Sequence, residues 1–288
     1  MEIAGSLFMY PKKRYGQHFL VDKNILRKII SVADIGKGED VLEIGPGLGH
    51  LTQALLESGA NVKAIEVDPS LAKELRRRFC GTKNLELIEA DALRVSFLEL
   101  SERYGKKFKV VSNLPYNISG PILVKFMEER DAFSGLFLML QKEVAQRLTA
   151  RPGTKDYGIL SVFTKAYAEA KREFDVSSQS FRPKPKVTST FVSLKIGGGA
   201  RIKKEEEGFF KKVVKSAFGH RRKTLFNALK SLGMESGELE KALKSCDIDP
   251  KRRGETLSLE EFIKLTGCLL RLGARAGGEG GAEGIPET

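Results

Sequence analysis

The stretch that decides the fold is "VLEIGPGLGHLT", residues 41–52. Its first four residues, "VLEI", have the composition of a buried strand. Gly45, Gly47 and Gly49 follow, and glycine lets the backbone turn sharply and approach a ligand closely. The residues after the glycines predict a helix that runs to about Glu57. A strand, a glycine-rich turn and a helix in this order are typical of the first unit of a doubly wound α/β fold.

The spacing of the glycines narrows the kind of ligand that this loop could hold. A dinucleotide fingerprint has the pattern G-x-G-x-x-G, whereas this loop has G-x-G-x-G, with Glu43 two residues ahead. The observed spacing suits a ligand that passes over the loop without a pyrophosphate at the helix N-terminus. For the loop taken alone, a tight strand-to-helix turn without a ligand is the alternative.

Strand-like and helix-like segments alternate beyond the loop. Four further strands are predicted at "VKAIEV", "LELIEAD", "KVVSN" and "GLFLMLQ", with helical stretches between them. This alternation predicts an α/β fold with a mostly parallel sheet. The segments "AKREFDVS" and "STFVSLKI" leave no room for a helix between them, so we expect an antiparallel pair that closes the sheet.

The composition changes after residue 196. "GGGA" predicts a linker, and residues 201–272 have apolar residues at helical spacing, which predicts a small all-helical domain. Residues 273–288 contain little apolar material and are expected to form a disordered tail. The predicted organisation is therefore a domain over 1–196 with a basic N-terminal arm, a helical domain over 201–272, and the tail.

The charge balance favours a polyanionic partner. The chain has 49 Lys and Arg against 37 Asp and Glu, a formal net charge of +12, which is typical of proteins that bind nucleic acid or a membrane surface. No apolar run is long enough for a membrane span. Between residues 211 and 230 there are seven basic residues and no acid: Lys211, Lys212, Lys215, Arg221, Arg222, Lys223 and Lys230.

The chain has three widely spaced cysteines, Cys80, Cys246 and Cys268, and no C-x-x-C motif. The spacing favours neither a disulfide framework nor a zinc site, so we expect reduced thiols and a cytoplasmic location.

Polar residues stand at the ends of three successive predicted strands. Glu66 ends the second strand, where a carboxylate can accept hydrogen bonds from both hydroxyls of a ribose. Asp91 ends the third, where it can accept from an adenine amino group, and Asn113 ends the fourth. A solvated loop residue is the plain interpretation of any one of them. Because ligands bind at the carboxyl edge of open α/β sheets, the three together predict a nucleoside site.

The tetrapeptide "NLPY", residues 113–116, follows the fourth strand. Pro115 makes the turn rigid and directs the carbonyl of Leu114 outward. With the side-chain oxygen of Asn113, this carbonyl gives two acceptors for an exocyclic amino group on a base that stacks on Tyr116. Two acceptors favour a tetrahedral nitrogen with a localised lone pair, and they stabilise the positive charge that develops on methylation. For the tetrapeptide alone, a structural turn with Tyr116 in the core is the alternative.

Several segments of the chain together resemble a known family. The segments "YGQHFLVD", "EIGPGLGHLT", "EADAL", "NLPYNISGPIL", "FRPKPKVTSTFVSL" and "FGHRRKTLFNAL" are similar, in order, to blocks of the ribosomal RNA adenine N6-dimethyltransferases of the small-subunit type. The resemblance implies a class I methyltransferase (Rossmann-like) fold and S-adenosylmethionine as methyl donor, with no metal. It also implies N6,N6-dimethylation of two adjacent adenosines near the 3′ end of 16S rRNA. The expected partner is the small ribosomal subunit, and the expected state is a monomer.

The resemblance also implies roles for individual residues. Those expected to hold the donor are Gln17, His18 and Leu20 at its methionine end, Gly45 and Gly47 in the loop, Glu66 at the ribose, Asp91 and Ala92 at the adenine, and Asn113. Those expected at the target base are Asn113, Leu114, Tyr116 and Phe181, with the two rings on opposite faces of the base. Independently of the resemblance, the basic stretch predicts that Arg221, Arg222 and Lys223 contact rRNA, with a merely solvated basic face as the alternative.

Three other functions compete with this one. A methyltransferase that acts on large-subunit rRNA would share most of the motifs. A nucleic-acid-binding protein that keeps the fold without activity is disfavoured by the intact Glu66, Asp91, Asn113 and Tyr116. An NAD-dependent oxidoreductase is disfavoured by the glycine spacing.

Overall fold

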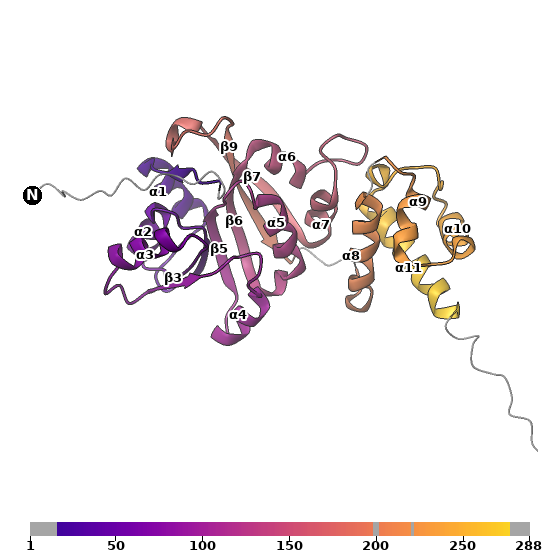
Figure 1. Ribbon diagram of the computed structural model, residues 1–288, viewed down its shortest axis with the longest axis horizontal. Coiled ribbons are helices and arrows are strands. Elements are labelled where there is room, and N and C mark those ends of the chain that lie inside the picture. Colours follow the sequence, from indigo (N-terminus) through magenta and orange to yellow (C-terminus); the bar gives the residue numbers. More distant parts are fainter. Residues whose placement is uncertain (1–15, 198–201, 220–221, 277–288) are drawn as a thin grey trace, which may run out of the picture. The chain divides into compact units, whose positions relative to one another are not determined.

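The computed structural model describes residues 16–197, 202–219 and 222–276 (Figure 1). These residues form two compact units. The first comprises the described residues up to Gln146 together with Ala168–Ile196, and the second comprises Arg147–Tyr167 and the described residues from Gly197 onward. Arg221 and residues 277–288 of the predicted tail lie outside the described residues.

The first unit is built on a seven-stranded sheet in the order β4-β3-β2-β5-β6-β9-β7. The strands are β2 (Asp40–Ile44), β3 (Asn61–Glu66), β4 (Leu85–Glu89), β5 (Phe108–Asn113), β6 (Phe133–Gln141), β7 (Ala168–Val176) and β9 (Ser189–Ile196). Five strands pair in parallel, and β9 pairs antiparallel with both β6 and β7. The predicted α/β fold with a mostly parallel sheet and the antiparallel pair are confirmed.

The helices of this unit are α1 (Lys23–Val32), α2 (His50–Glu57), α3 (Pro69–Arg78), α4 (Phe97–Tyr104), α5 (Ser119–Glu128) and α6 (Lys142–Leu148), of which α6 crosses into the second unit. Local sequence sets several of their starts. The Asp68 side chain accepts from the backbone N–H of Ser70, and Pro69 occupies the first turn of α3, where its missing N–H costs nothing. Ser96 caps α4 in the same way. Apolar residues of α1 and α2, among them Ile29 and Leu55, pack with Val41 and Val62 of the sheet.

A second, two-stranded sheet joins distant parts of the first unit. Strand β1 (Phe19–Leu20) pairs antiparallel with β8 (Phe181–Arg182), so that Leu20 lies opposite Phe181. This ladder fixes the residues around His18 against the segment that leads into β9.

The second unit is helical, as the sequence predicts. It contains α7 (Ile159–Tyr167), α8 (Lys204–Gly219), α9 (Leu225–Leu229), α10 (Ser236–Ser245) and α11 (Leu259–Ala276). Among the described residues, no helix has both the length and the apolar character needed to cross a membrane.

The limits of the units differ from the predicted domain limits, because Arg147–Tyr167 belongs to the second unit. Helix α7 buries its apolar side chains against the C-terminal helices. The rings of Phe163 and Tyr167 both lie 6.4 Å from that of Phe210 on α8. The Tyr157 hydroxyl donates to the carbonyl of Leu257 at 2.8 Å. The predicted domain over 1–196 groups residues 147–167 with the sheet. The side chains of this segment pack instead with the helices of the second unit.

Two of the three cysteines are paired. Cys246, directly after α10, and Cys268, within α11, form a disulfide with their Cα atoms 6.9 Å apart, and Cys80 is an exposed free thiol. The expectation of three separate thiols is therefore corrected for this pair. The 22-residue separation hides the contact, which arises because α10 packs on α11.

Candidate functional site

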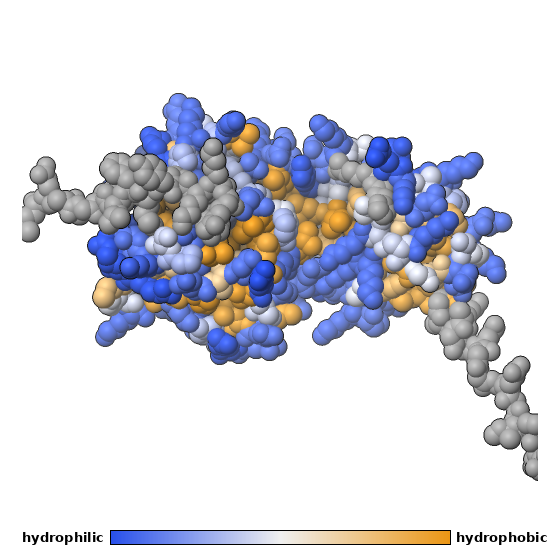
Figure 2. Space-filling model, in the orientation of Figure 1, coloured by the Kyte–Doolittle hydropathy of each residue, from blue (hydrophilic) through white to orange (hydrophobic). Residues whose placement is uncertain are grey.

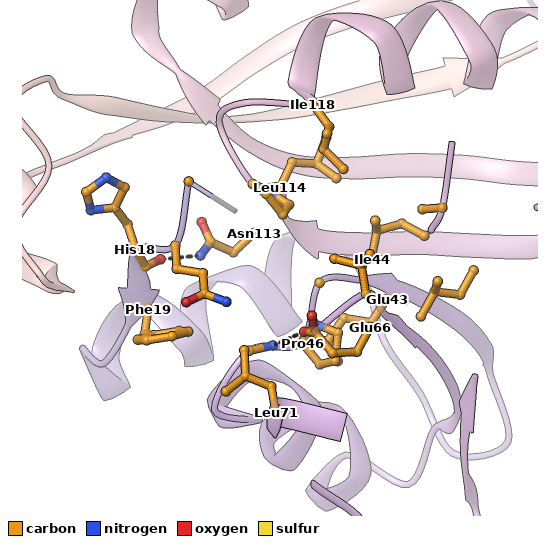
Figure 3. Close-up of a pocket in the computed structure, with 18 of the residues that line it drawn as sticks. His18, Phe19, Glu43, Ile44, Pro46, Glu66, Leu71, Asn113, Leu114 and Ile118 are labelled. Carbon is orange, nitrogen blue, oxygen red and sulfur yellow. Dashed lines mark hydrogen bonds between the residues drawn. The ribbon is translucent and has the colours of Figure 1, made fainter. Parts of the chain in front are cut away.

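A cavity of about 270 Å³ lies at the edge of the sheet where the parallel strands end (Figure 3). Its walls come from the β1 segment, the loops after β2, β3 and β4, and the "NLPY" turn after β5. Of the predicted site residues in the first unit, all but Phe181 line it: Gln17, His18, Leu20, Gly45, Gly47, Glu66, Asp91, Ala92, Asn113, Leu114 and Tyr116. The sheet topology thus brings together residues that are up to about a hundred positions apart in the chain.

The glycine loop packs directly against other walls of the cavity. Gly45 and Gly47 have φ angles of +67° and +59°, which favour glycine. A Cβ atom at Gly45 would lie 2.9 Å from the Pro115 ring, and one at Gly47 would lie 2.7 Å from the Phe19 ring. Glycine is therefore required at both positions by backbone conformation and by space.

Glu66 is a buried carboxylate that holds the loop. It is 4% exposed. One oxygen accepts from the backbone N–H of Gly47 at 3.1 Å and the other from that of Asp68 at 2.9 Å. Burial raises its pKa, although the two backbone hydrogen bonds oppose this effect. A carboxylate has about four acceptor sites, so each oxygen can still accept a hydrogen bond from a ligand hydroxyl.

Glu43, which has no predicted role, is a second buried acid in the wall of the cavity. It is 2% exposed, and the Thr52 hydroxyl donates to it at 2.7 Å. Burial raises its pKa to about 8, with a further rise from the charge of Glu66 and an opposing effect of the Thr52 hydrogen bond. At neutral pH this carboxyl group therefore carries its proton.

The raised pKa of Glu43 predicts a pH-dependent stability. Because the folded-state pKa of about 8 exceeds the ordinary value of 4.5, the free energy of unfolding should fall as pH rises from 4.5 to about 8 and level off above. One such group contributes a slope of up to about 1.4 kcal/mol per pH unit. The variant Glu43→Gln keeps an acceptor for Thr52 and should flatten this slope in denaturant unfolding at pH 5.5, 6.5 and 7.5. The exposed control Glu102→Gln should keep the wild-type slope. Equal slopes in wild type and Glu43→Gln would contradict the assignment.

The Asn113 amide is held in one orientation. Its Nδ2 donates to the backbone carbonyl of His18 at 2.9 Å, and Figure 3 shows the two groups facing each other. Only the amino group can donate to a carbonyl, so the position of Oδ1 is determined. This oxygen is buried and has no hydrogen-bond partner among the described residues. An unpartnered buried acceptor is costly unless a ligand satisfies it.

Tyr116 is half-buried and held at two points. Its hydroxyl shares a hydrogen bond of 2.6 Å with the Ser189 hydroxyl, and its ring centroid lies 5.1 Å from that of His18, tilted by 34°. The Nδ1 atom of His18 is 2.8 Å from the carbonyl oxygen of Pro183. Burial raises the pKa of the Tyr116 phenol, so the hydroxyl stays protonated at neutral pH. Ser189 was not predicted as a site residue, because a serine at the start of a strand has no distinguishing pattern in the sequence.

The sequence also matches a known family over most of its length. The family described as ribosomal RNA adenine dimethylase matches residues 10–269. The chain belongs to the ribosomal RNA adenine dimethylase family.

Two relatives are similar over nearly the whole chain. The ribosomal RNA small subunit methyltransferase A of Geobacter metallireducens is 44% identical and covers 92% of this chain and 97% of its own. The protein of the same name from Moorella thermoacetica is also 44% identical, and it covers 91% of this chain and 93% of its own.

Two solved structures of related enzymes have the same fold. A dimethyladenosine transferase from Plasmodium falciparum has a TM-score of 0.71 at 29% identity and covers 89% of this chain and 98% of its own. The 23S rRNA methyltransferase ErmE has a TM-score of 0.60 at 26% identity, and it covers 87% of this chain and 99% of its own.

Two of the predicted site residues, Asp91 and Phe181, lie at positions that differ from those predicted. Asp91 stands two residues beyond the end of β4, where its side chain accepts from the backbone N–H of Leu93 at 3.0 Å and still lines the cavity. Phe181 is fully buried in the hydrophobic core with Leu20 and Phe191, outside the cavity wall. Stacking of Phe181 on a target base stays a prediction, and it requires this ring to leave the core position seen here.

The described residues among the predicted RNA contacts belong to the second unit. Arg222 and Lys223 are exposed just before Thr224, whose side chain caps α9. Arg221 lies outside the described residues. Lys211 belongs to the acid-free stretch over 211–230. It forms an ion pair of 2.6 Å with Glu207, which lies one turn earlier in α8. In Figure 2, hydrophilic side chains project from the surface of this unit.

Proposed function

We propose that the protein uses S-adenosylmethionine to dimethylate N6 of two adjacent adenosines near the 3′ end of small-subunit rRNA. The observation that carries this proposal is the Asn113 amide, whose Oδ1 is buried and without a partner among the described residues. The names of the relatives, which are small-subunit methyltransferases, support the choice of subunit.

The cavity fits the donor by the chemistry of its walls. Glu66 can accept from the two ribose hydroxyls, and Asp91 from the adenine amino group. Gln17 and His18 line the cavity on the β1 side, where the methionine end would lie. When bound, S-adenosylmethionine supplies an electrophilic methyl carbon on a sulfonium.

The residues at the "NLPY" turn prepare the target amine. The Oδ1 atom of Asn113 accepts one amino hydrogen. The backbone carbonyl of Leu114, in the same turn, accepts the other. Both oxygens stabilise the positive charge that develops on the nitrogen, and the Tyr116 π face adds to this effect. Neither oxygen is basic enough to keep a proton, so the proton released by the amine passes to solvent.

Mass spectrometry of the rRNA tests the proposed function. Unmethylated 30S subunits and naked 23S rRNA are incubated separately with the protein and S-adenosylmethionine. We expect two dimethylated adenosines in the 30S sample and none in the 23S sample. The similarity to ErmE makes methylation of 23S rRNA the second candidate, and that product with unmodified 30S subunits would overturn the choice of subunit.

We also propose that Arg222 and Lys223 contact rRNA phosphates. Each phosphate contact adds about 0.9 to the slope of log affinity against log salt, so the double replacement Arg222→Ala and Lys223→Ala should reduce that slope by up to about 2. Filter binding to 30S subunits at several salt concentrations measures this. The control replaces the exposed Lys241 and Lys244 of α10, which removes the same charge. If both double variants have the same slope, net charge rather than these two contacts sets the salt dependence.

A further inference from the structure

Ser189 lies at the ligand edge of the sheet because of strand direction. It is the first residue of β9, which runs antiparallel to β6, and it stands opposite Gln141 at the end of that strand. The start of an antiparallel strand therefore meets the edge at which the parallel strands end. Its hydroxyl reaches the Tyr116 hydroxyl at 2.6 Å, across 73 positions of the sequence.

The position of Ser189 is rigid. It is 0% exposed and belongs to a strand that is paired on both sides, with Gln141 of β6 and with Val176 of β7. A side chain on such a strand has little freedom to follow a moving partner. The hydrogen bond thus ties the tip of the Tyr116 ring to the body of the sheet, although the rest of that residue belongs to a turn.

The other support of the ring comes from a different direction. The His18 imidazole packs against the Tyr116 ring, and its contact with the Pro183 carbonyl fixes the imidazole in turn. Packing limits how far the ring can tilt, but it does not fix rotation within the ring plane or sliding across the imidazole. A directional hydrogen bond to the hydroxyl restricts both.

We infer that Ser189 is a positioning residue, which holds the Tyr116 ring in the plane on which the target adenine stacks. The inference rests on the proposed function. A base taken out of its helix must stack at one place for its amino group to meet the acceptors of Asn113 and Leu114. A ring that can rotate or slide would hold the same base in several poses, most of them unproductive.

The test compares the wild type with variants in the rate of single-turnover methyl transfer. The substrate is unmethylated 30S subunits, and S-adenosylmethionine is saturating. Ser189→Ala and Tyr116→Phe should each slow transfer by about three- to tenfold, which corresponds to the loss of one ordinary hydrogen bond. The double variant should be no slower than either single variant, because both remove the same bond. Calorimetry should show donor affinity within about twofold of wild type in all three. The matched control is Ser193→Ala on the same strand, whose hydroxyl bonds to Glu173 at 2.7 Å, and it should transfer at the wild-type rate.

A second measurement reads the contact without any turnover. In protein labelled with ¹³C at tyrosine Cζ, the Tyr116 signal, assigned by its loss in Tyr116→Phe, should shift in Ser189→Ala and stay in place in Ser193→Ala. An unshifted signal, a wild-type transfer rate in folded Ser189→Ala, or a double variant slowed by the product of the single effects would each overturn the role of Ser189. A wild-type protein that methylates no 30S subunits would instead overturn the proposed function, and this inference with it.

Discussion

Replacing Asn113 by alanine should slow methyl transfer about 10²- to 10³-fold, which is the effect of removing one group that stabilises charge in a transition state. The Oδ1 atom of Asn113 is buried and has no partner among the described residues, so we expect its hydrogen bond to form only when the target amine arrives. Loss of the Nδ2 bond to the His18 carbonyl should weaken donor binding as well, but by much less.

Single-turnover transfer at saturating donor, together with calorimetry of donor binding, separates the two effects. Asn61→Ala is the matched control, because the Asn61 amide also donates to a backbone carbonyl, that of Gly38, at 3.3 Å and lies outside the cavity wall. It should transfer at nearly the wild-type rate. If the whole loss in Asn113→Ala can be explained by weaker donor binding, Asn113 holds the donor and does not activate the amine.

Replacing Glu66 by alanine should weaken S-adenosylmethionine binding about 100-fold or more. Hydrogen bonds to a charged group contribute about 1.5–3 kcal/mol each, and two ribose hydroxyls would be lost. The backbone N–H groups of Gly47 and Asp68 also lose their acceptor, so we expect a folded protein with a lower free energy of unfolding. Ribose hydroxyls favour the ionised carboxylate, whose pKa is raised by burial, and donor affinity in the wild type should therefore increase with pH.

Calorimetry on the folded variant measures this effect, and thermal unfolding checks the fold. Glu89 provides the matched control, since it stands opposite Glu66 on the adjacent strand, pairs with Arg76 at 2.9 Å and lies outside the cavity wall. Glu89→Ala should leave donor affinity unchanged. An unchanged affinity in folded Glu66→Ala would remove Glu66 from the ribose site.

Much of the fold and of the cavity could be predicted because it depends on local pattern. Alternating strands and helices predict a parallel sheet, and the carboxyl ends of parallel strands meet at one edge. Glu66 and Asn113, which end β3 and β5, therefore had to share that edge. The φ angles above zero at Gly45 and Gly47 are what the glycine loop indicates.

Packing between distant segments decided the rest. The sequence indicates the pair β7 and β9, but only the sheet order places β9 between β6 and β7 and brings Ser189 to Tyr116. The same holds for Phe181, an aromatic residue that the β1–β8 ladder places in the core.

Local pattern alone determined which residues stand at the ends of the parallel strands. Hydrophobic periodicity, turn residues and glycine spacing each depend on only a few neighbouring residues. Tertiary structure alone decided which of their atoms are free to act. The carbonyl of His18 takes one end of the Asn113 amide and leaves the other without a partner among the described residues. A hydrogen-bond partner 95 positions away leaves no trace in the surrounding sequence, because it depends on how the whole chain packs.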